Sequence, residues 1–111
     1  MELTTREDGR VTVLTVVGDL VIGEAESNFK RTVTHLLEDG RIHLLVDLGR
    51  VGFLDSSGLG ALVRALTISQ KEGGQTKLVN AGPQVRKLLE MTKLDSVFEI
   101  HDDLEKAVLS F

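Results

Sequence analysis

Hydrophobic and polar positions along the chain change period several times, and each change marks a predicted element. Residues 3–7 and 11–17 have the pattern of strands and flank Asp8-Gly9-Arg10, where an Asp-Gly pair accepts the positive φ angles of a tight hairpin. From Glu24 onward, apolar residues recur three and four positions apart, which predicts a helix that ends near Gly40. Its inward face consists of Ala25, Phe29, Val33, Leu36 and Leu37. The chain therefore opens with a hairpin and a helix.

The middle of the chain predicts a buried strand followed by a second helix. Residues 42–48 form a short apolar run between turn residues, which is typical of a strand covered on both faces. The next helical pattern begins near Ser56 or Ser57 and stops at Gly73-Gly74. Its inward face consists of Leu59, Leu62, Val63 and Leu66.

The last third of the chain repeats this alternation. Residues 77–80 predict a strand, and Pro83 suits the first turn of the helix that follows. Residues 97–100 predict a last short strand, and Asp102 and Glu105 stand at capping-box spacing before a closing helix. The inward positions of these two helices are Val85, Leu88 and Leu89, and then Leu104 and Val108.

The predicted order of elements is β-β-α-β-α-β-α-β-α. An initial hairpin followed by alternating helices and strands predicts an α/β fold with a mixed, mostly parallel sheet and helices packed on it. A chain of 111 residues and 12.1 kDa exposes about 6,000 Å² when folded and about 17,500 Å² when unfolded. Because 41% of its residues are apolar, we expect residues 1–111 to form a single domain with one core.

Composition argues against several classes of function. Thirteen Lys and Arg against 17 Asp and Glu give a net charge of −4, which disfavours nucleic acid as a partner. The absence of cysteine excludes disulfides, thiolate metal sites and cysteine nucleophiles. No apolar run approaches the roughly 20 residues of a membrane span, and the first residues lack the pattern of a signal peptide. We therefore expect a cytoplasmic protein without direct membrane insertion.

The sequence offers no catalytic or metal centre. His35, His43 and His101 are scattered, without the i, i+4 spacing of two ligands on one helix face. We expect His43 to be a hydrogen-bonded core or edge residue and His35 to lie on a partly exposed helix flank. A serine hydrolase needs glycine two residues before its serine, where this chain has Leu54 or Asp55. The expected protein is therefore not an enzyme and has no cofactor.

The segment between the buried strand and the second helix carries the candidate site. Asp55 is the expected N-cap, so the hydroxyls of Ser56 and Ser57 should lie at the positive end of the helix dipole. A phosphate there adds about −1.5 to −2 charge and accepts hydrogen bonds from unpaired amides of the first turn. Two simpler interpretations stay open. The segment can be a plain helix cap, and Phe53-Leu54 and Leu59 can form a hydrophobic staple rather than an exposed apolar ridge that binds a partner.

The hexapeptide Asp55-Ser56-Ser57-Gly58-Leu59-Gly60 closely resembles the signature of anti-sigma factor antagonists, the stand-alone bacterial STAS domains. The strand Leu44-Leu45-Val46-Asp47-Leu48 and the segment Val51-Gly52-Phe53-Leu54 precede it, as in that family. The Gly18-Asp19-Leu20 corner and the Gly73-Gly74 helix end extend the resemblance to the whole chain. The resemblance implies a single STAS domain over residues 1–111.

The resemblance also implies a phosphorylation switch in partner choice. In the family, the unmodified antagonist binds an anti-sigma factor that is also a serine kinase, and this binding frees the sigma factor. The kinase phosphorylates the first serine of the motif, here Ser56, and a serine phosphatase restores it; Ser57 is the second candidate. The implied contact and positioning residues are Asp19, Asp55, Ser57, Gly58, Leu59 and Gly60.

One departure from the family concerns the corner, because Val21 stands where the family often has aspartate. Asp19 or Glu24 is then the alternative source of a carboxylate that faces the partner. For the apolar pair Val21-Ile22 itself, burial is the commoner outcome. Two other functions remain open. One is a STAS scaffold or accessory subunit of a transport or signalling complex without a phosphoswitch. The other is a nucleotide sensor that binds phosphate at the Ser56 helix end. The expected oligomeric state is a monomer or weak dimer.

Overall fold

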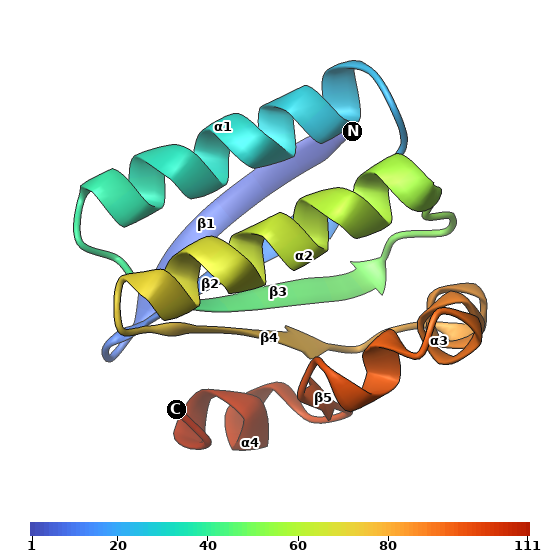
Figure 1. The fold of residues 1–111 in the computed structure, drawn as a ribbon. Coiled ribbons are helices and arrows are strands. Elements are labelled where there is room, and N and C mark those ends of the chain that lie inside the picture. Colours follow the sequence, from blue (N-terminus) through green and yellow to red (C-terminus); the bar gives the residue numbers. More distant parts are fainter.

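The computed structural model describes residues 1–111, and its elements follow the predicted order with one added 3-10 helix (Figure 1). The strands are β1 (Glu2–Asp8), β2 (Val11–Val17), β3 (His43–Arg50), β4 (Gln75–Val79) and β5 (Ile100–His101). The helices are α1 (Glu24–Glu38), α2 (Ser56–Lys71), α3 (Pro83–Met91), the 3-10 helix η1 (Leu94–Ser96) and α4 (Leu104–Leu109). None of the helices is both long and apolar enough to span a bilayer.

The strands form one sheet in the order β1-β2-β3-β4-β5. β1 and β2 pair antiparallel, from Glu2 opposite Val17 to Asp8 opposite Val11, and β3, β4 and β5 are added in parallel. Only Gly9 takes a positive φ in the hairpin turn, at 62°, because Asp8 still belongs to β1. The predicted mixed, mostly parallel sheet with an initial hairpin is confirmed.

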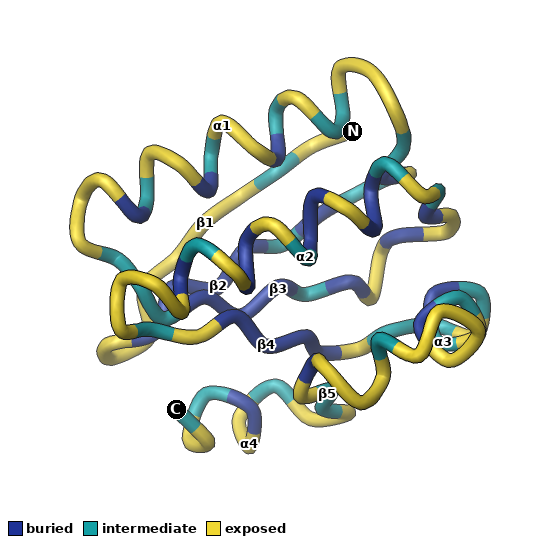
Figure 2. The backbone as a smooth tube through the Cα atoms, viewed as in Figure 1, coloured by how far each residue is buried: buried dark blue, intermediate teal, exposed yellow.

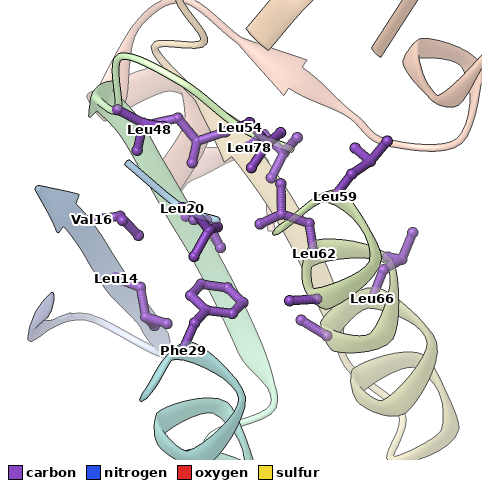
Figure 3. Close-up of a cluster of buried hydrophobic side chains, with 14 of the residues drawn as sticks. Leu14, Val16, Leu20, Phe29, Leu48, Leu54, Leu59, Leu62, Leu66 and Leu78 are labelled. Atoms are coloured by element: carbon purple, nitrogen blue, oxygen red, sulfur yellow. The ribbon is translucent and has the colours of Figure 1, made fainter. Parts of the chain in front are cut away.

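Helices α1 and α2 lie side by side over one face of the sheet, which we call the two-helix face (Figure 1). Three fully buried residues lie between these helices and the sheet: Leu14 of β2, Phe29 of α1 and Leu62 of α2 (Figure 3). The cluster on this face contains 20 buried residues and extends to Val85 and Leu89 of α3. The inward residues predicted for the first three helices therefore lie in the main core or pack against it. Leu104 and Val108, predicted for the last helix, pack instead against a second, smaller cluster.

The opposite face, which we call the α4 face, is covered by the short helix α4 near the C-terminus (Figures 1 and 2). Side chains alternate between the two faces along each strand, so neighbours of the main-core residues point here. A second cluster fills this face with five buried residues: Val11, Val13, Leu45, Val79 and Ala107. Both faces of β3 are thus covered, as its apolar run predicts.

The strand predicted over residues 97–100 is wrong in its extent. The amides of Val97 and Phe98 both donate to the carbonyl of Leu94, which closes the 3-10 turn of η1. Val97 has helical backbone angles, φ −93° and ψ −41°, so the chain is not extended there, and Phe98 enters the main core. Only Ile100–His101 pairs with β4.

The capping box predicted for the last helix is also wrong. The N-cap of α4 is Asp103, whose carboxylate accepts a hydrogen bond from the Lys106 amide at 3.0 Å. Asp102 instead pairs with Arg86 of α3, one residue before the cap. The two adjacent aspartates therefore have different roles: Asp103 caps α4, and Asp102 connects the preceding turn to α3 through its ion pair with Arg86.

Candidate functional site

Asp55 begins α2 as the predicted N-cap. The residue is extended, with φ −98° and ψ −177°, and its Oδ1 accepts a hydrogen bond from the Gly58 amide at 2.8 Å. This bond satisfies one of the unpaired first-turn amides and fixes the start of the helix at Ser56. The cap therefore determines where the serine pair lies.

The second carboxylate oxygen of Asp55 bonds a different segment. Oδ2 accepts a hydrogen bond from the amide of Ile22 at 2.9 Å, in the corner between β2 and α1. The hydrogen bond from Ile22 and then that from Gly58 lower the pKa of Asp55, because both favour the ionised form. A single ionised carboxylate thus joins the β2–α1 corner to the first turn of α2.

The Ser56 side chain is exposed at this helix start, and Ser57 is half-buried beside it. Neither hydroxyl makes a hydrogen bond within the chain, and the amides of Ser56 and Ser57 donate to no backbone carbonyl. Ser56 therefore offers a free hydroxyl next to amides without a backbone partner, at the positive end of a 16-residue helix.

The other residues of the hexapeptide differ in their surroundings. A Cβ added to Gly58 would lie 2.1 Å from the carbonyl oxygen of Leu20, so the helix meets the corner backbone directly. Leu59 is buried in the main core. Gly60 is exposed, and a Cβ added there would have open space within 4 Å. Gly58 and Leu59 therefore hold the site in place, whereas Gly60 belongs to its surface.

The apolar residues around the site are distributed differently from the prediction. Of the two alternatives for Phe53-Leu54 and Leu59, burial of Leu54 and Leu59 in one cluster fits the staple, and of the ridge only Phe53 is exposed, at 48%. The prediction of a buried Val21-Ile22 pair is wrong: Val21 is half-buried and Ile22 is 71% exposed, because the chain turns at the surface here, with the Ile22 amide bonded to Asp55. Phe53 and Ile22 belong to the two segments that meet at the Leu20–Leu54 bridge.

A hollow of about 400 Å³ lies at the β2–α1 corner. It is lined by Met1, Asp19, Val21, Glu24, Ala25 and Asn28. Both acidic residues are exposed and neither forms a salt bridge within the chain. The corner therefore presents two free carboxylates, although Val21 itself carries none.

Sequence reasoning missed Gln84, which contacts the backbone just before Asp55. From the second position of α3, its Oε1 accepts from the Leu54 amide at 3.2 Å, and its Nε2 donates to the Leu54 carbonyl at 3.5 Å. A polar residue in the first turn of a helix carries no signal for such a contact, because 30 residues separate the two partners.

The histidines take no part in these contacts. His35 is exposed on α1, whereas the buried Nδ1 of His43 has no hydrogen-bond partner, so the prediction of a hydrogen-bonded His43 is wrong. The His43 ring packs edge-on against Phe111, with ring centroids 6.0 Å apart. Burial first, and then the charges of Arg10 and Lys77, lower the pKa of His43, which favours the neutral ring.

One family model matches nearly the whole chain. The family model for the STAS domain matches residues 2–107. The anti-sigma F factor antagonist of Paenibacillus polymyxa is 31% identical over 61 residues, which are 55% of this chain and 52% of that protein. The match thus spans about half the length of that curated relative.

Solved structures agree with this arrangement of elements. The crystal structure of a candidate anti-sigma factor antagonist from Thermotoga maritima superposes with a TM-score of 0.92 at 28% identity, covering 97% of this chain and 92% of that chain. The phosphorylated form of the Bacillus cell fate determinant SpoIIAA gives a TM-score of 0.78 at 21% identity and covers 96% of each chain. The second likeness shows the fold alone.

Proposed function

This chain belongs to the STAS domain family, and we propose that it is an anti-sigma factor antagonist switched by phosphorylation of Ser56. The unmodified protein binds an anti-sigma factor that is also a serine kinase, and this binding releases a sigma factor in the cytoplasm. The kinase then modifies Ser56, and a serine phosphatase resets it. The protein is a regulatory binding module and a substrate, and its own residues carry out no chemistry.

The observation that carries the proposal is the free Ser56 hydroxyl at the start of α2. The side chain is exposed, makes no hydrogen bond within the chain, and follows an ionised cap residue, Asp55. A kinase requires an accessible acceptor oxygen, and Ser56 supplies one. Ser57 is half-buried, so it is the less accessible of the two candidates.

A phosphate at Ser56 changes the surface more than the fold. It adds about −1.5 to −2 charge beside Asp55, and the amide of Ser56, which donates to no backbone carbonyl, offers a hydrogen bond to its oxygens. The helix start therefore tolerates the modification. The added charge repels an acidic partner surface and makes the desolvation of this patch costly.

The surface around Ser56 suits a protein partner. Ile22 and Phe53 expose apolar side chains on the two segments joined by the Leu20–Leu54 bridge. Asp19 and Gly60 are exposed as well, and Asp19 carries an unpaired carboxylate. Apolar contacts ringed by charge are typical of regulated protein interfaces.

Intact-mass spectrometry of the protein isolated from its native cells, with peptide mapping across residues 51–64, tests the proposal. We expect a condition-dependent fraction with one phosphate on Ser56, and its loss in Ser56→Ala but not in Ser57→Ala. Ser56→Asp should lower the affinity for the copurifying kinase about 30-fold, since charging a central contact commonly costs about 2 kcal/mol.

Two results would contradict the proposal. Phosphorylation of Ser56→Ala at the wild-type level would remove Ser56 as the acceptor. A complete absence of phosphate under many growth conditions, with transporter or scaffold proteins copurifying, would favour an accessory subunit. Saturable micromolar binding of GTP or ATP in equilibrium dialysis would instead favour a nucleotide sensor.

A further inference from the structure

Leu54 is the residue through which the rest of the fold holds the Ser56 segment. It is 1% exposed, lies two residues before Ser56 and belongs to no regular strand. Buried backbone amides and carbonyls need hydrogen-bond partners, so the partners of this segment determine where it lies. On one side, the Leu20 amide donates to the Phe53 carbonyl at 3.0 Å, and the Asp55 amide donates to the Leu20 carbonyl at 3.4 Å.

The other side of Leu54 faces no strand. Its amide and carbonyl contact the Gln84 side chain, at 3.2 Å to Oε1 and 3.5 Å from Nε2. The primary amide of glutamine presents one acceptor and one donor side by side, as the backbone of a neighbouring strand does. Gln84 therefore takes the place of a missing strand at this point.

The helix that carries Gln84 is itself fixed in the core. Val85 and Leu89 of α3 are fully buried in the main cluster, and Arg86 pairs with Asp102 in the turn before α4. A side chain anchored on such an element cannot follow local movements of the Ser56 segment. The position of α3 is thus transmitted to Leu54 through two hydrogen bonds.

We propose that Gln84 is a positioning residue for Ser56: its amide clamps Leu54 and so sets the position of the α2 start relative to α3. The consequence for phosphorylation rests on the proposed function of Ser56. The clamp holds the backbone of Leu54. The position of the Ser56 hydroxyl depends on it, because only Asp55, the N-cap of α2, lies between the two residues. Misplacement of an acceptor by even a small distance slows group transfer.

Three variants separate hydrogen bonding from packing. Gln84→Met keeps the length of the side chain and removes the donor and the acceptor. Gln84→Glu keeps an acceptor for the Leu54 amide and removes the donor to its carbonyl. Gln70→Met makes the same chemical change at an exposed position near the far end of α2, so it is the matched control.

The first test measures amide hydrogen exchange and amide chemical shifts by NMR, without any partner. In Gln84→Met we expect the Leu54 amide to exchange about tenfold faster and the amide signals of Asp55 and Ser56 to shift, while Val46 in β3 keeps its exchange rate within about twofold. Gln84→Glu should restore most of the protection of Leu54. Unchanged exchange at Leu54, or a uniform acceleration that includes Val46, would overturn the clamp.

The second test measures phosphorylation by the kinase enriched from native cells on the immobilised wild-type protein. We expect Gln84→Met to lower kcat for Ser56 about fivefold or more with KM within about twofold, Gln84→Glu to recover part of kcat, and Gln70→Met to match the wild type. An unchanged kcat in Gln84→Met would overturn the effect on Ser56. If the wild type itself accepts no phosphate, the proposed function fails, and the exchange data still decide whether Gln84 holds the segment.

Discussion

The two faces of the sheet are stabilised in different ways. The two-helix face buries a cluster of 20 residues under α1 and α2, and its buried polar side chains include Ser69 and Thr76, whose hydroxyls bond each other at 2.8 Å. The α4 face buries five apolar residues under a helix of six residues. It therefore has far less apolar area to hold its cover in place.

The α4 face adds a buried ammonium group instead. The Lys77 side chain is 6% exposed, and its Nζ donates to the carbonyl and the Oγ of Ser110 at 2.8 and 2.9 Å. The same nitrogen lies 3.1 Å from a Glu99 carboxylate oxygen and 4.6 Å from the centre of the Phe111 ring. Where apolar area is small, directed polar contacts attach the C-terminal segment to the sheet.

The largest effect should come from the two-helix face. Leu62 is fully buried in the main cluster, so Leu62→Ala should lower the free energy of unfolding by about 3–4 kcal/mol through lost burial and a cavity. Urea denaturation followed by circular dichroism measures this loss. Leu109→Ala on α4, where the side chain is 83% exposed, should change it by less than about 0.5 kcal/mol. Similar losses in the two variants would contradict the role of Leu62 in the main core.

A smaller effect is expected at Lys77. Lys77→Ala should cost about 2 kcal/mol, because it removes the packed stem, the contact with Phe111 and the bonds to Ser110. Lys77→Met keeps the stem but loses the contacts of the ammonium group with Ser110 and Glu99, so it should cost about 1 kcal/mol, roughly half the cost of Lys77→Ala. Equal costs for the two variants would mean that the charge rather than the stem stabilises this face. Thermal unfolding of both proteins distinguishes the two cases.

The smallest effect is a dependence on pH that arises at the α4 face. The folded state lowers the pKa of His43 below its usual 6.5, so the unfolded chain binds more protons as the pH falls through this range. The free energy of unfolding should therefore decrease from about pH 7.5 to about pH 5.5. His43→Gln should flatten this slope, whereas His35→Gln on the exposed surface of α1 should leave it unchanged. An unaltered slope in His43→Gln would show that the ring does not contribute.

A second decrease should follow at lower pH, at the same face. The hydrogen bond from Lys77 first, and also that from His101, lower the pKa of Glu99. Stability from this carboxylate is present above its ordinary value of about 4.5 and is lost as the pH falls through the lowered one. Glu99→Gln should reduce the acid sensitivity in this range only, which separates it from the effect of His43.

Most of the fold could be predicted because long periodic segments carry their own signal. The stripes around Phe29 and Leu62 repeat over several turns, and the short run at residues 42–48 has no other stable location than a covered sheet. The errors fall where short elements depend on tertiary contacts. Burial of Phe98 determines the turn at η1, and Arg86 attracts Asp102 away from the cap of α4.

The candidate site was predictable only in part, for the same reason. Asp55 caps the following helix through a contact three residues away, which a local pattern records. The exposure of Ile22 and the clamp from Gln84 depend on contacts across 33 and 30 residues. Such contacts leave no local pattern, because glutamine in a first helical turn and an apolar corner residue are each compatible with many environments.

The strand order has a consequence for the way the chain folds. Since β1 to β5 lie in the sheet in the order of the sequence, every strand pairs with the one before it, and no strand inserts between two earlier ones. Each parallel pairing nevertheless joins residues 22 to 33 positions apart, so much of the sheet consists of long-range contacts, which form more slowly than those of a helical bundle. A nascent chain can extend its sheet outward from the hairpin, one strand at a time. The α4 face stays uncovered until α4 (Leu104–Leu109) has been synthesised and packs on it. Val13 and Leu45 therefore remain exposed to solvent for longer than the residues of the main core during folding.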